Sequence, residues 1–180
     1  MHFPHKDIRL PAKSYKGQRS YFVTICCENH QRIFANPTIA VEVIEVLRKR
    51  AIGHEFAIRA YCVMPDHFHM LASGLEPTSD LLAFVKNFKQ TTSREYRKTC
   101  GGTLWQKKFH DHILRPGDKS LRVAGYIWRN PVRAGLCADP REYAHSGSFV
   151  MDWKKLISPM ESWVPDWKGM AKTETANAPG

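Results

Sequence analysis

The feature that most constrains the fold is a pair of strand-like segments joined by a very short turn. Residues 56–63 and 67–73 are rich in β-branched, aromatic and other apolar side chains, and the turn residues Pro65 and Asp66 stand between them. So short a connection makes the two segments neighbours in an antiparallel β-hairpin. Because alternate residues of a strand face opposite sides, His67 and His69 are expected on one face, with Phe68 on the other.

Residue patterns on either side of this hairpin predict further strands and helices. Strands are expected at 21–27 and 109–115, and helices at about 36–53, 80–98 and 119–130. The resulting order is β-α-β-β-α-β followed by a helix. It predicts an α+β protein of ferredoxin-like type, in which one antiparallel sheet has two helices on one face and the other face open.

The length of 180 residues is that of a single domain with a substantial hydrophobic core. We expect a basic N-terminal arm at 1–20, a central domain at 21–150 and a partly disordered C-terminal tail at 151–180.

The charge of the chain predicts a polyanionic partner. Lysine and arginine number 27 against 17 aspartate and glutamate, which gives a net charge of +10 and a pI near 9.5. Nucleic acid is the commonest partner of such a protein, although a merely basic soluble protein is the alternative. Candidate DNA-contacting residues are those on the basic side of the second predicted helix and just after the third, namely Lys86, Lys89, Arg94, Arg97 and Arg133.

Cysteine usage and apolar runs predict a cytoplasmic protein with no membrane partner. The five cysteines are odd in number and show no CxxC spacing, so neither a disulfide framework nor a thiolate zinc site is indicated. No apolar run approaches the ~20 residues that span a bilayer, and the N-terminal residues lack the apolar core of a signal peptide.

A tyrosine on the last predicted helix adds a nucleophile to the histidine pair. Two adjacent imidazoles commonly begin a divalent-metal site, although such a pair, taken alone, is more often two ordinary side chains. Tyr126 and Asn130 are four residues apart, so a helix would bring them to one face. Pro131 disfavours helical geometry at Asn130, which leaves open whether Asn130 lies within the last turn or at the helix end. A tyrosine oxygen facing a metal-polarised phosphate is suited to cutting a nucleic-acid strand.

Three stretches together resemble a known family. They are YCVMPDHFH at 61–69, LWQKKFHDH at 104–112 and YIWRNPVRAGL at 126–136. In order and spacing, the chain from about residue 15 to 149 resembles the HUH-type single-tyrosine transposases, which move insertion sequences as single-stranded DNA. Within that family it most resembles the REP-associated tyrosine transposases, a branch linked to repeated extragenic palindromes.

This resemblance implies a role for each matching residue. His67 and His69 would bind Mg²⁺ or Mn²⁺, and Tyr126 would cleave single-stranded DNA through a 5′-phosphotyrosine intermediate. Asn130 stands where relatives present a polar third ligand, often glutamine, and is one methylene shorter. The implied substrate forms hairpins, the central domain becomes the HUH transposase domain, and the protein is expected to be a monomer or a homodimer.

Three alternatives remain open at this stage. The chain could be a catalytically silent DNA-binding protein of the same fold, although the intact histidine pair and Tyr126 weigh against that. A replication initiator or relaxase uses the same combination of a histidine pair and a tyrosine nucleophile, but such proteins are usually longer. A metal-dependent hydrolase using His67, His69 and His112 would cut without a covalent intermediate, although an ordinary strand position is the favoured interpretation of His112.

Overall fold

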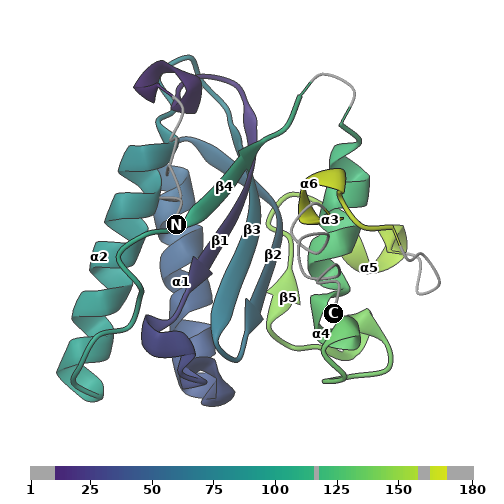
Figure 1. Cartoon of the computed structure of the whole chain (residues 1–180). Coiled ribbons are helices and arrows are strands. Elements are labelled where there is room, and N and C mark those ends of the chain that lie inside the picture. Colours follow the sequence, from purple (N-terminus) through teal and green to yellow (C-terminus); the bar gives the residue numbers. More distant parts are fainter. Residues whose placement is uncertain (1–10, 116–117, 158–162, 170–180) are drawn as a thin grey trace, which may run out of the picture.

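The computed structural model describes residues 11–115, 118–157 and 163–169 and shows a five-stranded antiparallel sheet with helices on both faces (Figure 1). The strands are β1 (Ser20–Cys26), β2 (Phe56–Met64), β3 (His67–Gly74), β4 (His110–Ile113) and β5 (Ser146–Gly147). They lie side by side in the order β4-β1-β3-β2-β5. All four strands expected from the sequence are present, and β5 is a fifth strand that the sequence patterns did not indicate.

The expected hairpin is confirmed. Strands β2 and β3 pair in antiparallel register, with Met64 opposite His67 and Cys62 opposite His69, and only Pro65 and Asp66 connect them. On its other side β3 pairs with β1, which places Thr24 opposite His69. The histidines therefore lie in the middle of the sheet rather than at an edge.

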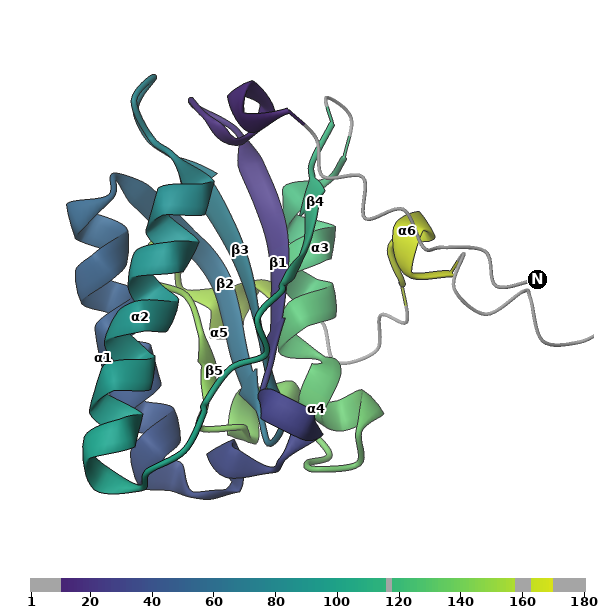
Figure 2. The ribbon, with the colours of Figure 1, turned by 60° about the vertical axis from the view of Figure 1, so that its left-hand side comes forward.

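Two long helices cover one face of the sheet (Figure 2). Helix α1 (Pro37–Gly53) begins after Asn36, whose side chain accepts a hydrogen bond from the Thr38 N–H at 3.0 Å, and helix α2 (Leu81–Thr99) begins after Asp80 in the same way. Their apolar sides and alternate strand residues form one core; its fully buried members include Tyr21, Val23, Ile25, Leu47, Phe68, Met70, Phe84 and Phe88. Phe68 thus points away from the histidines, as strand alternation requires.

The opposite face is covered as well, so the expectation of an open second face is wrong. Helix α3 (Ser120–Trp128) packs there against β2 and β3, followed by α4 (Asn130–Arg133) and α5 (Trp153–Leu156). These elements form a second core with the alternate strand residues; it contains Phe22, Ala60, Cys62, Leu71, Val123, Ile127, Trp128 and Trp153. Large apolar side chains on both sides of a strand must each be buried, which is why the sheet is sandwiched.

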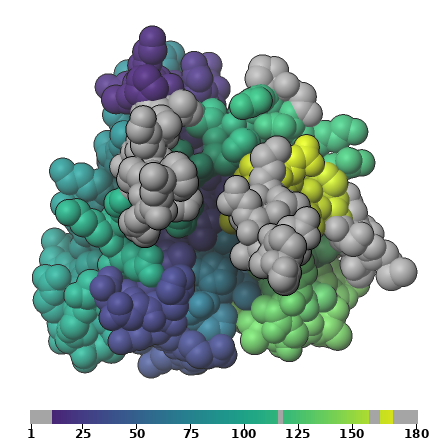
Figure 3. Space-filling view, in the orientation of Figure 1, coloured from purple at the N-terminus to yellow at the C-terminus, as the bar shows by residue number. Residues whose placement is uncertain are grey.

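Both ends of the described chain pack onto this framework. Tyr15, in the short 3-10 helix Ala12–Tyr15, is only 2% exposed, and Lys16 bridges to Asp80. At the other end α6 (Asp166–Gly169) lies at the surface, where its atoms are drawn in yellow in Figure 3, and its Trp167 stacks on His112 of β4. The predicted arm and the predicted disorder of the tail fall partly on residues 1–10 and 170–180, which lie outside the described residues. None of the helices in the described ranges is long and apolar enough to cross a membrane.

Candidate active site

The two histidines of β3 face each other on the side of the sheet that α3 covers. Their Nε2 atoms are 3.0 Å apart, and the Nδ1 atom of each ring is held by a different neighbour. The Asp66 carboxylate lies 2.7 Å from Nδ1 of His67, and the Thr24 hydroxyl lies 2.8 Å from Nδ1 of His69. Both rings are therefore fixed by their outer nitrogens, with the inner nitrogens turned toward one point.

Hydrogen bonding and burial set the protonation of this pair. A carboxylate only accepts hydrogen bonds, so Asp66 draws the proton of a neutral His67 to Nδ1 and leaves a lone pair on Nε2. Burial, and then the charge of His67, hold the pKa of His69 well below its ordinary value of 6.5. A neutral His69 and the lone pair of His67 leave imidazole nitrogens that can act as metal ligands at one point.

Tyr126 reaches the same side of the sheet from α3. Its side chain is half-buried, and its ring stands 6.2 Å from the ring of Phe22, which in turn lies 5.5 Å from the ring of His69. The guanidinium of Arg133 lies over the Tyr126 ring, 3.9 Å from its centroid. The structure thus brings together Tyr126 and the histidine pair, which are 57 residues apart or more in sequence, around one phenylalanine.

The sequence left open whether Asn130 lies within the last turn of its helix or at the helix end; α3 ends at Trp128, and Asn130 follows it as the first residue of α4. Its amide nitrogen donates to the carbonyl oxygens of Tyr126 at 3.3 Å and Ile127 at 3.1 Å, and its oxygen accepts a hydrogen bond from Arg133 at 2.7 Å. The side chain therefore satisfies carbonyl groups at the helix end, where they have no partner within the helix. Its role as a metal ligand stays a prediction of the resemblance.

No ready-made metal cluster is present among the described ranges. They contain no group of three or more histidine, cysteine, aspartate or glutamate side chains arranged to hold an ion. His112, the third histidine of the hydrolase alternative, instead stacks on Trp167 with ring centroids 3.7 Å apart, and its Nε2 lies 3.9 Å from Asp118. This placement is that of a packing residue, as the sequence interpretation favoured.

The basic residues of α2 lie in the helix layer on the opposite side of the sheet from Tyr126 (Figures 1 and 2). Lys86, Arg94 and Arg97 are exposed, and Arg94 pairs with Glu95 at 3.2 Å. The ammonium of Lys89 donates to two backbone carbonyls, of Gln106 and Lys107, and so holds the segment before β4. Arg133 is the one member of the predicted DNA-contacting set that these contacts place beside the histidine and tyrosine site.

Sequence reasoning missed four residues at this site. Thr24 and Asp66 hold the histidines, and Trp167 and Lys168 of α6 reach the ring of Phe22, Trp167 at 6.4 Å and Lys168 at 5.0 Å. The contact of Asp66 with His67 can be predicted because the two residues are adjacent in sequence. The contact of Thr24 with His69 can be predicted only once the register of β1 with β3 is known. For α6 no local signal exists, because its contacts depend on how the chain returns to the sheet.

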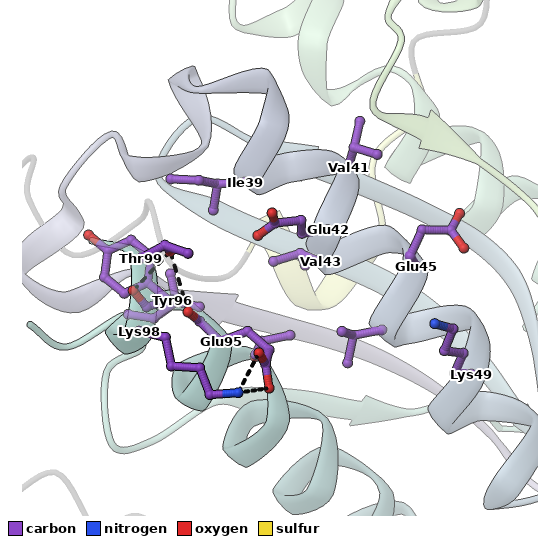
Figure 4. A pocket seen from close by; sticks show the side chains of 13 residues that line it. Ile39, Val41, Glu42, Val43, Glu45, Lys49, Glu95, Tyr96, Lys98 and Thr99 are labelled. Atoms are coloured by element: carbon purple, nitrogen blue, oxygen red, sulfur yellow. Dashed lines mark hydrogen bonds and ion pairs between the residues drawn. The ribbon is translucent and has the colours of Figure 1, made fainter. Parts of the chain in front are cut away.

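A hollow of about 390 Å³ lies between α1 and α2 (Figure 4). Its walls are mostly apolar, with Glu42 and Glu45 from α1 and Glu95, joined to Lys98, from α2. Because these helices cover the face opposite the histidines, this hollow is separate from the candidate active site.

Comparison with known proteins gives the class of the chain. A family model described as "Transposase IS200 like" matches residues 16–129, a stretch that holds both histidines and Tyr126. The chain belongs to the IS200-like transposases.

Within that class, proteins similar to this chain include REP-associated tyrosine transposases. A Haemophilus influenzae protein provisionally given that name is 26% identical over 161 residues, covering 82% of this chain and 90% of that one. The REP-associated tyrosine transposase of Escherichia coli K12 is 27% identical over 128 residues, covering 71% of this chain and 69% of that one. A solved structure of a REP-associated tyrosine transposase bound to a REP hairpin is similar to this chain, with a TM-score of 0.68 and 20% identity. The similarity covers 89% of this chain and 92% of that one and shows that the two share a fold.

Proposed function

We propose that this chain is a metal-dependent single-tyrosine transposase, which cleaves and rejoins single-stranded DNA at hairpin-forming repeats in the cytoplasm. The observation that carries the proposal is that Tyr126 lies on the same side of the sheet as the facing pair His67 and His69, with the ring of Phe22 between Tyr126 and His69. We further propose that the fold is the ferredoxin-like βαββαβ arrangement and that α3 is its added helix, carrying the nucleophile.

The geometry of the histidine pair suits a divalent ion. The two Nε2 atoms face each other at 3.0 Å, so His67 and His69 would hold the same ion. The second ring nitrogen of a metal-bound histidine commonly donates its N–H to a carboxylate or another fixed oxygen, and Asp66 and Thr24 stand at those places. Oxygen atoms from water and phosphate would have to complete the sphere of Mg²⁺ or Mn²⁺.

The proposed reaction assigns the nucleophile to Tyr126. A divalent ion at the histidines would offset the charge on the oxygens of the scissile phosphate. The phenol oxygen of Tyr126 attacks phosphorus and passes its proton to water, because a neutral phenol is a weak nucleophile and must lose its proton to attack. The P–O3′ bond breaks, and its oxygen takes up a proton and leaves as a 3′-hydroxyl.

The 5′-phosphotyrosine that results conserves the energy of the phosphodiester bond. A 3′-hydroxyl of another strand can attack this phosphorus, which releases Tyr126 and reseals DNA without ATP. The charge of +10 supplies salt-sensitive attraction to the DNA backbone. The hairpin preference is proposed from the solved relative, which was bound to a REP hairpin.

The decisive experiment is incubation with end-labelled hairpin single-stranded DNA and Mn²⁺ or Mg²⁺, followed by denaturing electrophoresis. We expect a protein–DNA adduct that survives denaturation and is absent in Tyr126→Phe and in EDTA. Cleavage without an adduct would assign the chain to the hydrolase class. Tight binding with neither cleavage nor adduct would instead identify a silent DNA-binding protein.

A parallel titration tests the substrate class. Hairpin DNA should bind more tightly than a blunt duplex of the same sequence, and affinity should fall with salt by a slope of about −0.7 for each single-strand phosphate neutralised. Equal affinity for hairpin DNA and blunt duplex would contradict the proposed preference for hairpins. The same samples, examined by light scattering, distinguish the expected monomer from the homodimer.

A further inference from the structure

Helix α6 carries a lysine into the candidate active site. The ammonium of Lys168 lies 5.0 Å from the centroid of the Phe22 ring, the ring that stands between His69 and Tyr126. Next to it, Trp167 stacks on His112 of β4 with ring planes inclined by 12°. In Figure 2, α6 is the outermost element on the side of α3 and β4, and Lys168 and Trp167 are the residues by which it contacts the site.

Within the part of the chain that the structure describes, the charge of Lys168 has no carboxylate partner. Its side chain is half-buried, and among the described residues its ammonium forms no ion pair with an aspartate or glutamate. Burial, and then the nearby Arg133, lower the pKa of Lys168. A cation partly removed from water and without a counter-charge favours the binding of an anion.

Arg133 contributes a second cation at the same place. One terminal nitrogen of its guanidinium donates to the backbone oxygen of Tyr126 at 3.0 Å and to the side-chain oxygen of Asn130 at 2.7 Å. A guanidinium has five N–H groups, so these two contacts leave donors for a further ligand. Arg133 lies over the ring of Tyr126 and Lys168 over the ring of Phe22, and these two rings are 6.2 Å apart, so the two cations stand over neighbouring rings of the site.

We propose that Lys168 and Arg133 form an anion-binding subsite beside His69 and Tyr126, and that its ligand is a backbone phosphate of the DNA strand being cut. This inference rests on the proposed function. Arg133 provides planar donors suited to phosphate oxygens, and Lys168 provides a point charge from the opposite element. The subsite would hold a phosphate next to the Tyr126 hydroxyl, while the guanidinium of Arg133 stays stacked over the Tyr126 ring.

The test is the salt dependence of single-stranded DNA binding by Lys168→Met, measured in EDTA in the Tyr126→Phe background, where nothing is cleaved. Methionine keeps an apolar stem of similar length and removes the charge. We expect affinity to fall about tenfold, the effect of one charge-assisted hydrogen bond, and the salt slope to lose about 0.7. Lys168→Arg should restore both.

Lys155→Met is the matched control, because Lys155 is exposed and pairs with Asp152 at 2.8 Å on the neighbouring α5. It should leave affinity and slope unchanged. Equal losses in both variants would mean that Lys168 acts only through net charge, and tighter DNA binding or faster cleavage by Lys168→Met would mean that α6 takes the place of the substrate. Either result overturns the subsite.

Inorganic phosphate, titrated against the parent protein and Lys168→Met by calorimetry, distinguishes a free anion from backbone phosphate. We expect weak binding by both; loss of phosphate binding in Lys168→Met with no loss of DNA affinity would overturn the assignment to DNA. Because these measurements need no cleavage, they are separate from the adduct assay. A parent protein that forms no adduct contradicts the proposed function and leaves the binding result interpretable.

Discussion

Replacing Thr24 by valine isolates the contact that orients His69. Thr24 is 7% exposed and His69 is 4% exposed, and the hydroxyl and Nδ1 are 2.8 Å apart across the β1–β3 pair. Valine has nearly the same shape, so the change removes the hydroxyl and little packing. The ring of His69 then keeps its place in the core while its outer nitrogen loses its partner.

The size of the effect follows from that geometry. An unpaired polar atom in a buried site costs about 1–3 kcal/mol in the free energy of unfolding. For a domain of about this length each kcal/mol lowers Tm by about 2–4 °C, so we expect a loss of about 2–12 °C. Removing a partner that orients a metal-binding histidine typically lowers metal affinity about 10- to 100-fold. The Mn²⁺ concentration for half-maximal cleavage should rise accordingly.

The assay is adduct formation as a function of Mn²⁺, beside thermal unfolding in EDTA. Thr92→Val is the matched control, because Thr92 is also buried, at 3% exposed, and its hydroxyl accepts a hydrogen bond from Trp105 at 2.8 Å on the far face of the sheet. Thr92→Val should lose stability with no change in Mn²⁺ dependence. If Thr24→Val shows the parent Mn²⁺ dependence, or if both variants shift alike, His69 is not oriented for a metal in the way proposed.

Three further predictions test the site and its support. Tyr126→Phe should abolish the adduct and leave hairpin DNA binding nearly intact, because it removes one hydroxyl from a half-buried ring; a residual rate of a tenth would exclude Tyr126 as the nucleophile. Phe68→Ala should lower the free energy of unfolding by about 3–5 kcal/mol in urea melts, since its ring is fully buried against Phe88. Metal-free protein should lose stability as pH falls below 6.5, because burial lowers the pKa of His69 and His145 and the unfolded chain binds those protons first; flat urea midpoints between about pH 5 and 7 would contradict this.

The hairpin and the helix starts were predictable because their determinants are local. A two-residue turn between Met64 and His67 leaves one pairing for β2 and β3, and the alternation of side chains then fixes the side on which His67 and His69 lie. Asn36 and Asp80 begin their helices through contacts within three residues. Such features depend on a few neighbouring residues, so single-sequence reasoning reaches them.

The covering of the second face was not predictable for the opposite reason. Its elements come from the last third of the chain, where Trp153 and Trp167 stand in short helices of four residues, too short to show a helical period. The contact of Lys168 with Phe22 joins residues almost at opposite ends of the chain. Packing between residues this far apart in sequence decides which polar side chains of the tail contact the site. The composition of the tail does not predict those contacts.

Asn130→Asp separates the two roles open to Asn130. The carboxylate keeps an oxygen for Arg133 but has no N–H to donate to the carbonyls of Tyr126 and Ile127, and it sets a negative charge against the negative end of α3. We expect a loss of about 1–2 kcal/mol in the free energy of unfolding, with the Mn²⁺ dependence of adduct formation unchanged. A carboxylate is a stronger ligand for Mn²⁺ than a carboxamide, so a ligand at this position would instead gain metal affinity on the same substitution. Tighter Mn²⁺ dependence in Asn130→Asp would therefore place Asn130 in the metal sphere and refute its confinement to the helix end.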